Sequence, residues 1–444
     1  MNELNARYLP EDDALRLELH NEVHARPSAR VRLPALIVFV AVLNEGVERT
    51  QEWAHLKTLP GHAHLALERL NGNFLRLRCD GFTVKWERHT EFTRYSIVQP
   101  MPAHAFLGAK EPELASHVVT DSAWLRAIPG KTVAAIHLGM LPADLNAPNI
   151  LAQGQAWLGE GAVVGSRMGN NMQGQPHSCV LTHFRLGDDG FERMLVLAPA
   201  GSSETRVGRI SQRLLELETY RLMALRGLPV AKSLSPTLSQ AETHLADITA
   251  RMEHKGDSDQ VCLDLLVSLA ARTERAMAEH GYRFSATRAY ADLVNQRITE
   301  LRERPMEGTQ TVGEFMRRRL FPAMATVAAT AQRMTSLSER VARTSALLRT
   351  RVDIATETQN QVLLEKLTKG QELQLRLQST VEGLSIAAIS YYVISLLFYG
   401  AKALNAMGLP IQPEMAAGAM VPLVLWGVWR TTRKIHDKLH VAVN

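Results

Sequence analysis

The first part of the chain carries the hydrophobic pattern of β-strands. Residues 33–43, LPALIVFVAVL, form an uninterrupted apolar run that predicts a buried strand. The segment NFLRLRCDGFTVKWERHTEFTRYSIV alternates apolar and polar side chains around Asp80-Gly81, a dipeptide typical of a tight hairpin turn. Further strand-like segments follow, and the last should fold back at Asp189-Gly190: KTVAAIHLGML, AVVGSRM and SCVLTHFRLGDDGFERMLVLA. We therefore predict an α+β domain over residues 1–204.

After this domain the apolar positions change to a helical spacing. The segment RVGRISQRLLELETYRLMAL opens a helical region that we expect over residues 205–305. Within it, Thr237 and Gln240 resemble a capping box at the start of a helix. From Pro322 one helical pattern continues toward the C-terminus, and we expect a long stalk helix over residues 306–382.

Apolar residues in the stalk recur every seven positions, which is the spacing of a coiled coil. The repeated residues are Val327, Met334, Val341, Leu348, Ala355 and Val362. The second seam position is mixed in character, with Ala331, Ser338, Ser345, Val352 and Gln359. A continuous helix over residues 322–401 would be on the order of 120 Å long and poorly supported alone, so we expect a homo-oligomer. The alternative is a helix that packs back on its own domain.

Two apolar segments near the C-terminus predict a transmembrane hairpin over residues 383–429. Residues 383–401 are nineteen residues without a charge, enough to cross a hydrocarbon layer of about 30 Å. Residues 415–429 are fifteen uncharged residues, and this segment lengthens if the Arg430 side chain reaches the membrane surface.

The charges around the hairpin predict its orientation. The tail, residues 430–444, is basic, whereas the connector, residues 402–414, carries one charge of each sign. Basic segments stay on the cytoplasmic side, so we expect both termini there. The N-terminal sequence has no basic stretch followed by an apolar run, and we expect no signal peptide. These features predict a protein of the bacterial inner membrane whose partner is the lipid bilayer.

Composition adds few constraints. The chain has 444 residues, of which 46% are hydrophobic and 21% charged, so it can form a large core. The net charge of +5 is spread along the chain and gives no footprint of a nucleic-acid partner. Cys79, Cys179 and Cys262 are far apart, which argues against a disulfide framework or a cysteine zinc site and fits a reducing compartment. We expect no cofactor.

Three segments resemble a bacterial family of uncharacterised membrane-anchored proteins: EVHARP, QRLLELETYRLMALRGLP and LQLRLQSTVEGLSIAAISYYVISLLFYGAKAL. The resemblance implies membrane anchoring and transfers no activity. The order of domains is also loosely similar to that of CorA-type magnesium channels. Those channels end their first span with Tyr-Gly-Met-Asn, whereas here Tyr399-Gly400 is followed by Ala401-Lys402, which argues against magnesium selectivity.

The segment LHNEVHARP contains the main candidates for chemistry. His20 and His24 would lie about 40° apart on a helix, close enough to share a zinc ion. A zinc protease needs its glutamate directly after the first histidine, whereas Glu22 would point about 200° away from His20. We expect no metal, and we interpret these side chains as fixing the end of a helix before Pro27. The remaining hypothesis is a ligand-binding site that comprises His20, Glu22, His24 and Arg26, in which His24 and Arg26 hold an anionic ligand.

One face of the first predicted span is small or polar. Residues spaced three and four apart form this polar stripe: Ser385, Ala388, Tyr392, Ser395, Tyr399 and Lys402. Such a face should avoid lipid, so we expect it to pack on the second span or on other copies. The alternative is an ion pathway, in which a ring of Lys402 side chains would repel cations.

These patterns favour a structural or regulatory module without enzymatic activity. The Gly- and Asn-rich residues 165–178 lack the lysine of a phosphate-binding loop and precede a strand, so they predict a hairpin loop. Two alternatives stay open: an oligomeric ion channel or transporter of CorA-like architecture, and a metal-dependent hydrolase that uses His20 and His24.

Overall fold

The computed structural model describes residues 13–16, 19–20, 30–169, 176–253, 258–408, 410 and 412–441. The chain divides into two units. Unit 1 comprises residues 1–257 and 264–344, and unit 2 comprises residues 258–263 and 345–444.

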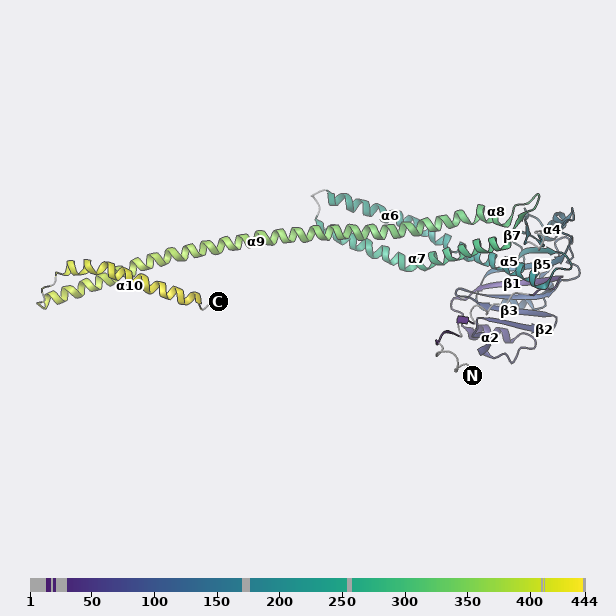
Figure 1. Ribbon diagram of the computed structural model, residues 1–444, viewed down its shortest axis with the longest axis horizontal. Coiled ribbons are helices and arrows are strands. Elements are labelled where there is room, and N and C mark those ends of the chain that lie inside the picture. The colour runs from purple at the N-terminus through teal and green to yellow at the C-terminus, as the bar shows by residue number, and fades with distance from the viewer. Residues whose placement is uncertain are drawn as a thin grey trace, which may run out of the picture. The chain divides into compact units, whose positions relative to one another are not determined.

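Within the described residues, nine strands form one mixed sheet in unit 1 (Figure 1). The sheet order is β2-β3-β4-β1-β5-β8-β7-β6-β9. The strands are β1 (Ala35–Leu43), β2 (Phe74–Cys79), β3 (Phe82–Arg88), β4 (Phe92–Pro100), β5 (Lys131–Pro142), β6 (Val164–Met168), β7 (Ser178–Leu186), β8 (Glu192–Ala198) and β9 (Arg304–Pro305). The pairing of β5 with β8 is parallel, whereas β1 pairs antiparallel with both β4 and β5. This mixed sheet confirms the predicted α+β class.

Helices and short helical turns connect the strands and continue after them. They are α2 (Arg49–Lys57), η2 (Leu67–Leu70), η3 (Ala115–His117), α3 (Ser122–Arg126), α4 (Ile150–Leu158), α5 (Glu204–Leu225), α6 (Gly227–Glu253), α7 (Asp259–Leu301), α8 (Val312–Arg319), α9 (Phe321–Ala406) and α10 (Pro413–Val441).

The central strand β1 shows why its sequence is apolar throughout. Its side chains alternate between two hydrophobic cores, one on each face of the sheet. Ile37 and Phe39 face the core that α5, α7 and α8 cover. Leu36 and Val38 face the core that includes Leu56 of α2. A strand buried on both faces needs no polar positions, and the prediction for residues 33–43 is confirmed.

Both predicted hairpin turns are also confirmed. β2 and β3 pair antiparallel on either side of the turn, and Gly81 has φ +75°. β7 and β8 pair antiparallel around Gly190, which has φ +80°. Glycine has no Cβ and adopts these positive φ values at little cost.

The predicted capping box at Thr237 and Gln240 is wrong. Helix α6 runs from Gly227 to Glu253 and contains Pro236 in its interior. Its buried residues Ala231, Leu234, Leu238, Leu245 and Ile248 continue one apolar face across this proline. Packing of that face therefore outweighs the local signal for a helix start.

The first half of the predicted stalk packs inside unit 1 (Figure 1). Arg333 of α9 pairs with Glu242 of α6 at 2.7 Å, and Ser338 Oγ donates to Glu274 of α7 at 2.9 Å. The seven-residue repeat is buried at Val327, Met334 and Val341. These residues of the repeat are thus buried by other parts of the same chain.

Unit 2 contains the rest of α9 and helix α10. Among the described residues of the chain, one helix is long and apolar enough to cross a membrane, and it ends at Ala406. Helix α10, as far as it is described, does not meet the same test. Ser390 of α9 is 2% exposed, and partly covered residues of both helices recur at helical spacing beside it. We infer that α9 and α10 pack through these faces.

Candidate functional site

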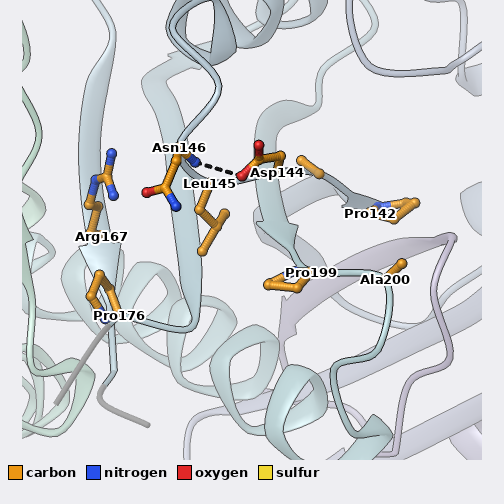
Figure 2. A pocket seen from close by; sticks show the side chains of 9 residues that line it. Pro142, Asp144, Leu145, Asn146, Arg167, Pro176, Pro199 and Ala200 are labelled. Carbon is orange, nitrogen blue, oxygen red and sulfur yellow. Dashed lines mark hydrogen bonds between the residues drawn. The ribbon is translucent and has the colours of Figure 1, made fainter. Parts of the chain in front are cut away.

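A large cavity lies at the edge of the sheet where two parallel strands end. Because β5 and β8 are parallel, Pro142 and Ala198 reach the same edge. The cavity has a volume of about 700 Å³ and is lined by the turns that follow these strands, together with Arg167 and Pro176 (Figure 2). Parallel strands commonly bind ligands outside their carboxyl ends.

The walls of this cavity offer few reactive groups. Asp144 Oδ1 accepts a hydrogen bond from the backbone N–H of Asn146 at 3.0 Å, which fixes the turn after β5 (Figure 2). Arg167 stands on the other wall and provides the cation. An arginine beside an amide and a carboxylate can bind a polar molecule.

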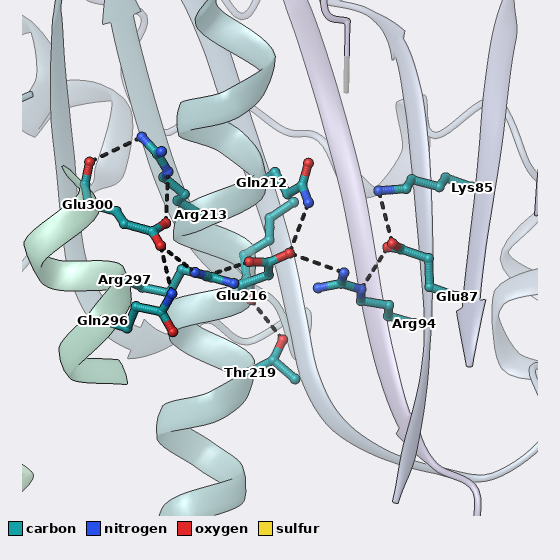
Figure 3. A network of polar contacts seen from close by, with 11 residues as sticks. Lys85, Glu87, Arg94, Gln212, Arg213, Glu216, Thr219, Gln296, Arg297 and Glu300 are labelled. Carbon is teal, nitrogen blue, oxygen red and sulfur yellow. Dashed lines mark hydrogen bonds and ion pairs between the residues drawn. The ribbon is translucent and has the colours of Figure 1, made fainter. Parts of the chain in front are cut away.

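A chain of charged side chains joins the sheet to the helices that cover it (Figure 3). Arg94 of β4 is 2% exposed, and its guanidinium lies 2.7 Å from Glu87 and 3.2 Å from Glu216 of α5. Glu216 also accepts from Arg297 of α7 at 2.6 Å, and Arg297 contacts Glu300 at 2.9 Å. The network thus connects β4, α5 and α7.

The charges in this network hold one another in the ionised state. Burial opposes the charged form of Arg94, but Glu87 and Glu216 outweigh it and raise the Arg94 pKa. Burial would raise the Glu216 pKa, but Arg94, a hydrogen bond from Gln212 and Arg297 lower it. Removing Arg94 would leave two buried carboxylates without this partner, which typically costs about 3–5 kcal/mol. The network is therefore a strong structural link.

A second buried group contains more acid than base. Glu192 of β8 and Glu218 of α5 are 5% and 0% exposed and are hydrogen-bonded to each other. Arg221 binds both oxygens of Glu218, and Thr182 Oγ1 donates to Glu192 at 3.2 Å. Burial raises the Glu192 pKa well above its usual range, and the Glu218 charge raises it further. The carboxyl of Glu192 is therefore harder to ionise than that of an ordinary glutamate.

This acid pair lies beneath a cavity of about 300 Å³, since Arg221 also lines that cavity. Phe184 lines it too and has φ +50°, at an irregularity of β7 between Thr182 and Leu186. Its ring stacks on Phe315 with centroids 4.6 Å apart. An aromatic residue in this strained backbone region often marks a functional position. Arg221 and the stacked Phe184 and Phe315 rings line the same cavity, which could therefore bind an anion that carries an apolar group.

The sheet contains a buried thiol and a buried imidazole, Cys179 and His137. Burial raises the pKa of Cys179 to about 12, so its thiol stays protonated. Burial lowers the pKa of His137 to about 4, although Asp189 Oδ2 lies 3.6 Å from its Nδ1. The His137 ring is fully buried and stacked on Phe191 at 3.9 Å between centroids. Both side chains are buried, and neither lines one of the two cavities described above.

The N-terminal candidates are only partly described. His20 is exposed, whereas Glu22, His24 and Arg26 lie outside the described residues. Among the residues that the structure describes, no group of three or more His, Cys, Asp or Glu side chains could hold a metal ion. The ligand-binding hypothesis for this segment and the hydrolase alternative stay predictions.

The polar stripe of α9 lies apart from Ser390, which marks the face packed on α10. Tyr392 and Tyr399 are 68% and 67% exposed, and Ser385 and Lys402 are also exposed. Ser395 is partly covered. Most of the stripe therefore lies on a face that α10 leaves exposed.

Sequence reasoning missed the buried charges of unit 1. The sequence does contain one indication of them, which is a charged residue inside an apolar run. The segment LLELETY contains Glu216 and Glu218, and the segment FTRYSIV contains Arg94. That signal indicates a buried charge. It could not identify the partners, because Arg94 and Glu216 are 122 positions apart and meet only in the fold.

One comparison gives a relationship over nearly the whole chain. Residues 11–439 match a family model described as a protein of unknown function, DUF3422. No curated protein and no solved structure matches the chain.

Proposed function

We propose a membrane-anchored role for this chain, which belongs to the DUF3422 family of proteins of unknown function. In this proposal the apolar part of α9 and helix α10 form a hairpin in the bacterial inner membrane. Unit 1 then acts in the cytoplasm as a regulatory or structural binding module that catalyses no reaction.

The exposed apolar surface of unit 2 carries this proposal. Leu384, Ile389 and Leu396 of α9 are 67%, 48% and 71% exposed, and Leu423 of α10 is 61% exposed. Soluble monomers rarely expose a continuous apolar surface of this kind. A lipid bilayer would cover it without any further protein.

The end of α10 contains the residue types that are common where a helix meets the membrane surface. Arg430 lies over the Trp426 ring at 5.1 Å from the centroid, and Arg433 lies over Trp429 at the same distance. Tryptophan and arginine are enriched where a helix leaves the hydrocarbon layer. This pairing supports a span that ends near residue 430.

The absence of enzymatic activity is part of the proposal and rests on the contents of unit 1. In the described part of the chain, Cys179 and His137 are 1% and 0% exposed, and neither lines one of the two cavities described above. The two cavities described above are lined mainly by arginine, proline and apolar residues instead. Such walls favour binding over bond cleavage.

Extraction of membranes at alkaline pH tests the anchor. The native chain should stay in the membrane pellet, as an integral protein does. The double substitution Ile389→Asp and Leu396→Asp should release it or prevent its insertion, because each aspartate near the middle of a span costs about 2.5–3.5 kcal/mol. Western blotting of pellet and supernatant measures the distribution.

The matched control is Leu363→Asp with Leu373→Asp, which changes two exposed leucines of α9 outside the apolar segment. This variant should remain in the pellet. Release of the native chain by alkali, or equal retention of both variants, would contradict the anchor.

An ion pathway is a second candidate because α10 leaves most of the polar stripe open. Tyr392 and Tyr399 could line such a pathway if several copies assemble around them. Lys402 would then stand in a ring and favour anions over cations. The same stripe could equally serve as a dry interface between copies.

A further inference from the structure

A pocket of unit 1 that is separate from both cavities above is lined mainly by basic residues. It has a volume of about 280 Å³. Its lining includes Arg206, Arg209 and Arg213 of α5, together with Arg302, His177 and Glu300. Four arginines against one glutamate leave three positive charges in excess.

The fold directs these arginines into one space. Arg206, Arg209 and Arg213 are three and four positions apart, so they share one face of α5. Arg302 follows the end of α7 and has φ +48°, a left-handed conformation that arginine rarely adopts. The chain thus accepts backbone strain at the residue that brings in the fourth guanidinium.

The one acid in the pocket is already engaged elsewhere. Glu300 Oε2 lies 3.2 Å from Arg213 Nε, and Glu300 Oε1 lies 2.9 Å from Arg297 Nη1 (Figure 3). Glu300 therefore compensates Arg213 and belongs to the network that reaches Arg94. The excess charge comes from Arg206, Arg209 and Arg302.

The arginines of the pocket affect the pKa of the histidine beside them, His177. Burial lowers the His177 pKa, and Arg206, Arg209 and Arg213 lower it further. The backbone of His177 is fixed by its N–H, which donates to Met168 at 3.1 Å. Its ring lies against Gly169, where an added Cβ would stand 2.1 Å from Nε2. The ring thus forms a neutral wall that can donate or accept a hydrogen bond.

We propose that this arginine pocket binds the anionic phosphate group of a small molecule or of a lipid headgroup. Guanidinium groups bind phosphate oxygens through paired hydrogen bonds, and several around one small space favour a compact polyanion. The volume admits a phosphate or pyrophosphate with part of an attached molecule. A free phosphorylated molecule and a lipid headgroup share this chemistry. The proposal does not depend on membrane anchoring.

Calorimetric titration with inorganic pyrophosphate tests the pocket. The sample is the full chain in a zwitterionic detergent at constant ionic strength and pH. Pyrophosphate should bind at one site per chain, and the double substitution Arg206→Ala with Arg209→Ala should weaken binding at least tenfold. The control Arg288→Ala removes an exposed arginine of α7 outside the pocket and should leave the affinity unchanged.

A second variant keeps the test independent of folding. Arg302→Gly removes one guanidinium and places at φ +48° the residue that tolerates this conformation best, so its melting temperature should not fall. Its affinity for pyrophosphate should nevertheless drop. Unchanged affinity in this variant and in the Arg206/Arg209 variant, or equal loss in Arg288→Ala, would overturn the proposal.

A second ligand separates the two sources of phosphate. Glycerophosphoglycerol is a soluble phosphodiester with one negative charge and reproduces a lipid headgroup. Weaker binding of this diester than of pyrophosphate supports a free phosphorylated molecule, whereas equal or tighter binding assigns the pocket to a headgroup. No binding of either compound contradicts a phosphate site.

Discussion

At the scale of single residues, unit 1 compensates its buried charges in two different ways. Glu216 lies between Arg94 and Arg297, so its carboxylate has two cations and stays ionised. Glu192 and Glu218 have one arginine between them, and burial together with the Glu218 charge raises the pKa of Glu192 and favours its protonated form. A buried carboxyl is therefore stable either when it is paired or when it is protonated.

The raised pKa of Glu192 predicts a pH dependence of stability. The folded-state pKa of Glu192 is raised, so its contribution to stability is present at low pH and is lost as the pH rises through the folded pKa. Glu192→Gln keeps a neutral hydrogen-bond donor toward Glu218. The variant should melt at a higher temperature than the native chain at pH 8, and the difference should vanish near pH 5. Scanning calorimetry of the detergent-solubilised chain measures both.

The opposite behaviour is expected of a paired carboxylate. Burial would raise the Glu87 pKa, but Arg94 and Lys85 lower it below its usual range. That contribution to stability is present at neutral pH and is lost as the pH falls. Glu87→Gln should therefore lower the melting temperature at pH 8. For the acid pair, a loss of stability in Glu192→Gln at pH 8 would contradict the raised pKa of Glu192.

At the scale of elements, the seven-residue repeat of α9 has two environments. Met334 and Leu348 of this repeat are 4% and 0% exposed, whereas Val362 is 48% exposed. Sequence spacing predicts that these residues share a helix face but not what covers the face, because a partner helix of the same chain and one of another copy bury the same positions. The predicted homo-oligomer therefore has only the later part of the repeat left for pairing.

The two faces of the apolar part of α9 give a testable difference. Ser390 is 2% exposed and marks the face toward α10, whereas Tyr392 and Tyr399 are mostly exposed. Hydropathy alone could not distinguish these faces, since both carry hydroxyl side chains. If copies assemble through the polar stripe, cysteines at 392 and 399 should form disulfides between copies in membranes. A cysteine at 390 should not.

Non-reducing gel electrophoresis after mild oxidation detects these disulfides. The background chain needs Cys79, Cys179 and Cys262 replaced, and the replacements at the buried Cys179 and Cys262 should be small and apolar. Cysteine at Leu396, which is 71% exposed, serves as the lipid-facing comparison. Crosslinking through 396 and 390 but not through 392 and 399 would exclude the stripe as an interface.

Labelling of 392 and 399 by a water-soluble thiol reagent would indicate a wet pathway.

At the scale of the whole molecule, the cavities and the exposed apolar surface belong to different units of the chain. Unit 1 contains the two-sided sheet and all three cavities described above, and unit 2 contains the exposed apolar surface. The α+β pattern and the long uncharged segment are local features that composition along the chain predicts. The boundary after residue 344 lies inside the predicted stalk and depends on how α9 packs. The cavities could not be predicted, because their walls come from segments as distant as Arg206 and Arg302.

This division predicts the topology of the chain in a bacterial membrane. The segment after the apolar part of α10 contains Arg430, Arg433 and Lys434, whereas the connector before α10 has one positive and one negative charge. Retention of the basic segment in the cytoplasm places the connector outside and unit 1 inside. A reporter active only in the periplasm should therefore be inactive when fused after Asn444 and active when inserted after Gly408.

The two reporter positions together decide between one span and two. If α9 crossed the membrane alone and α10 lay on its outer surface, both reporters would be active, because neither would return to the cytoplasm. If neither helix crossed, both would be inactive. The hairpin alone gives activity after Gly408 and none after Asn444. Substituting Arg430, Arg433 and Lys434 with glutamine should weaken this preference, since the retained positive charge sets the orientation. A variant that keeps the native pattern would show that unit 1, rather than the basic tail, holds the chain on its side of the membrane.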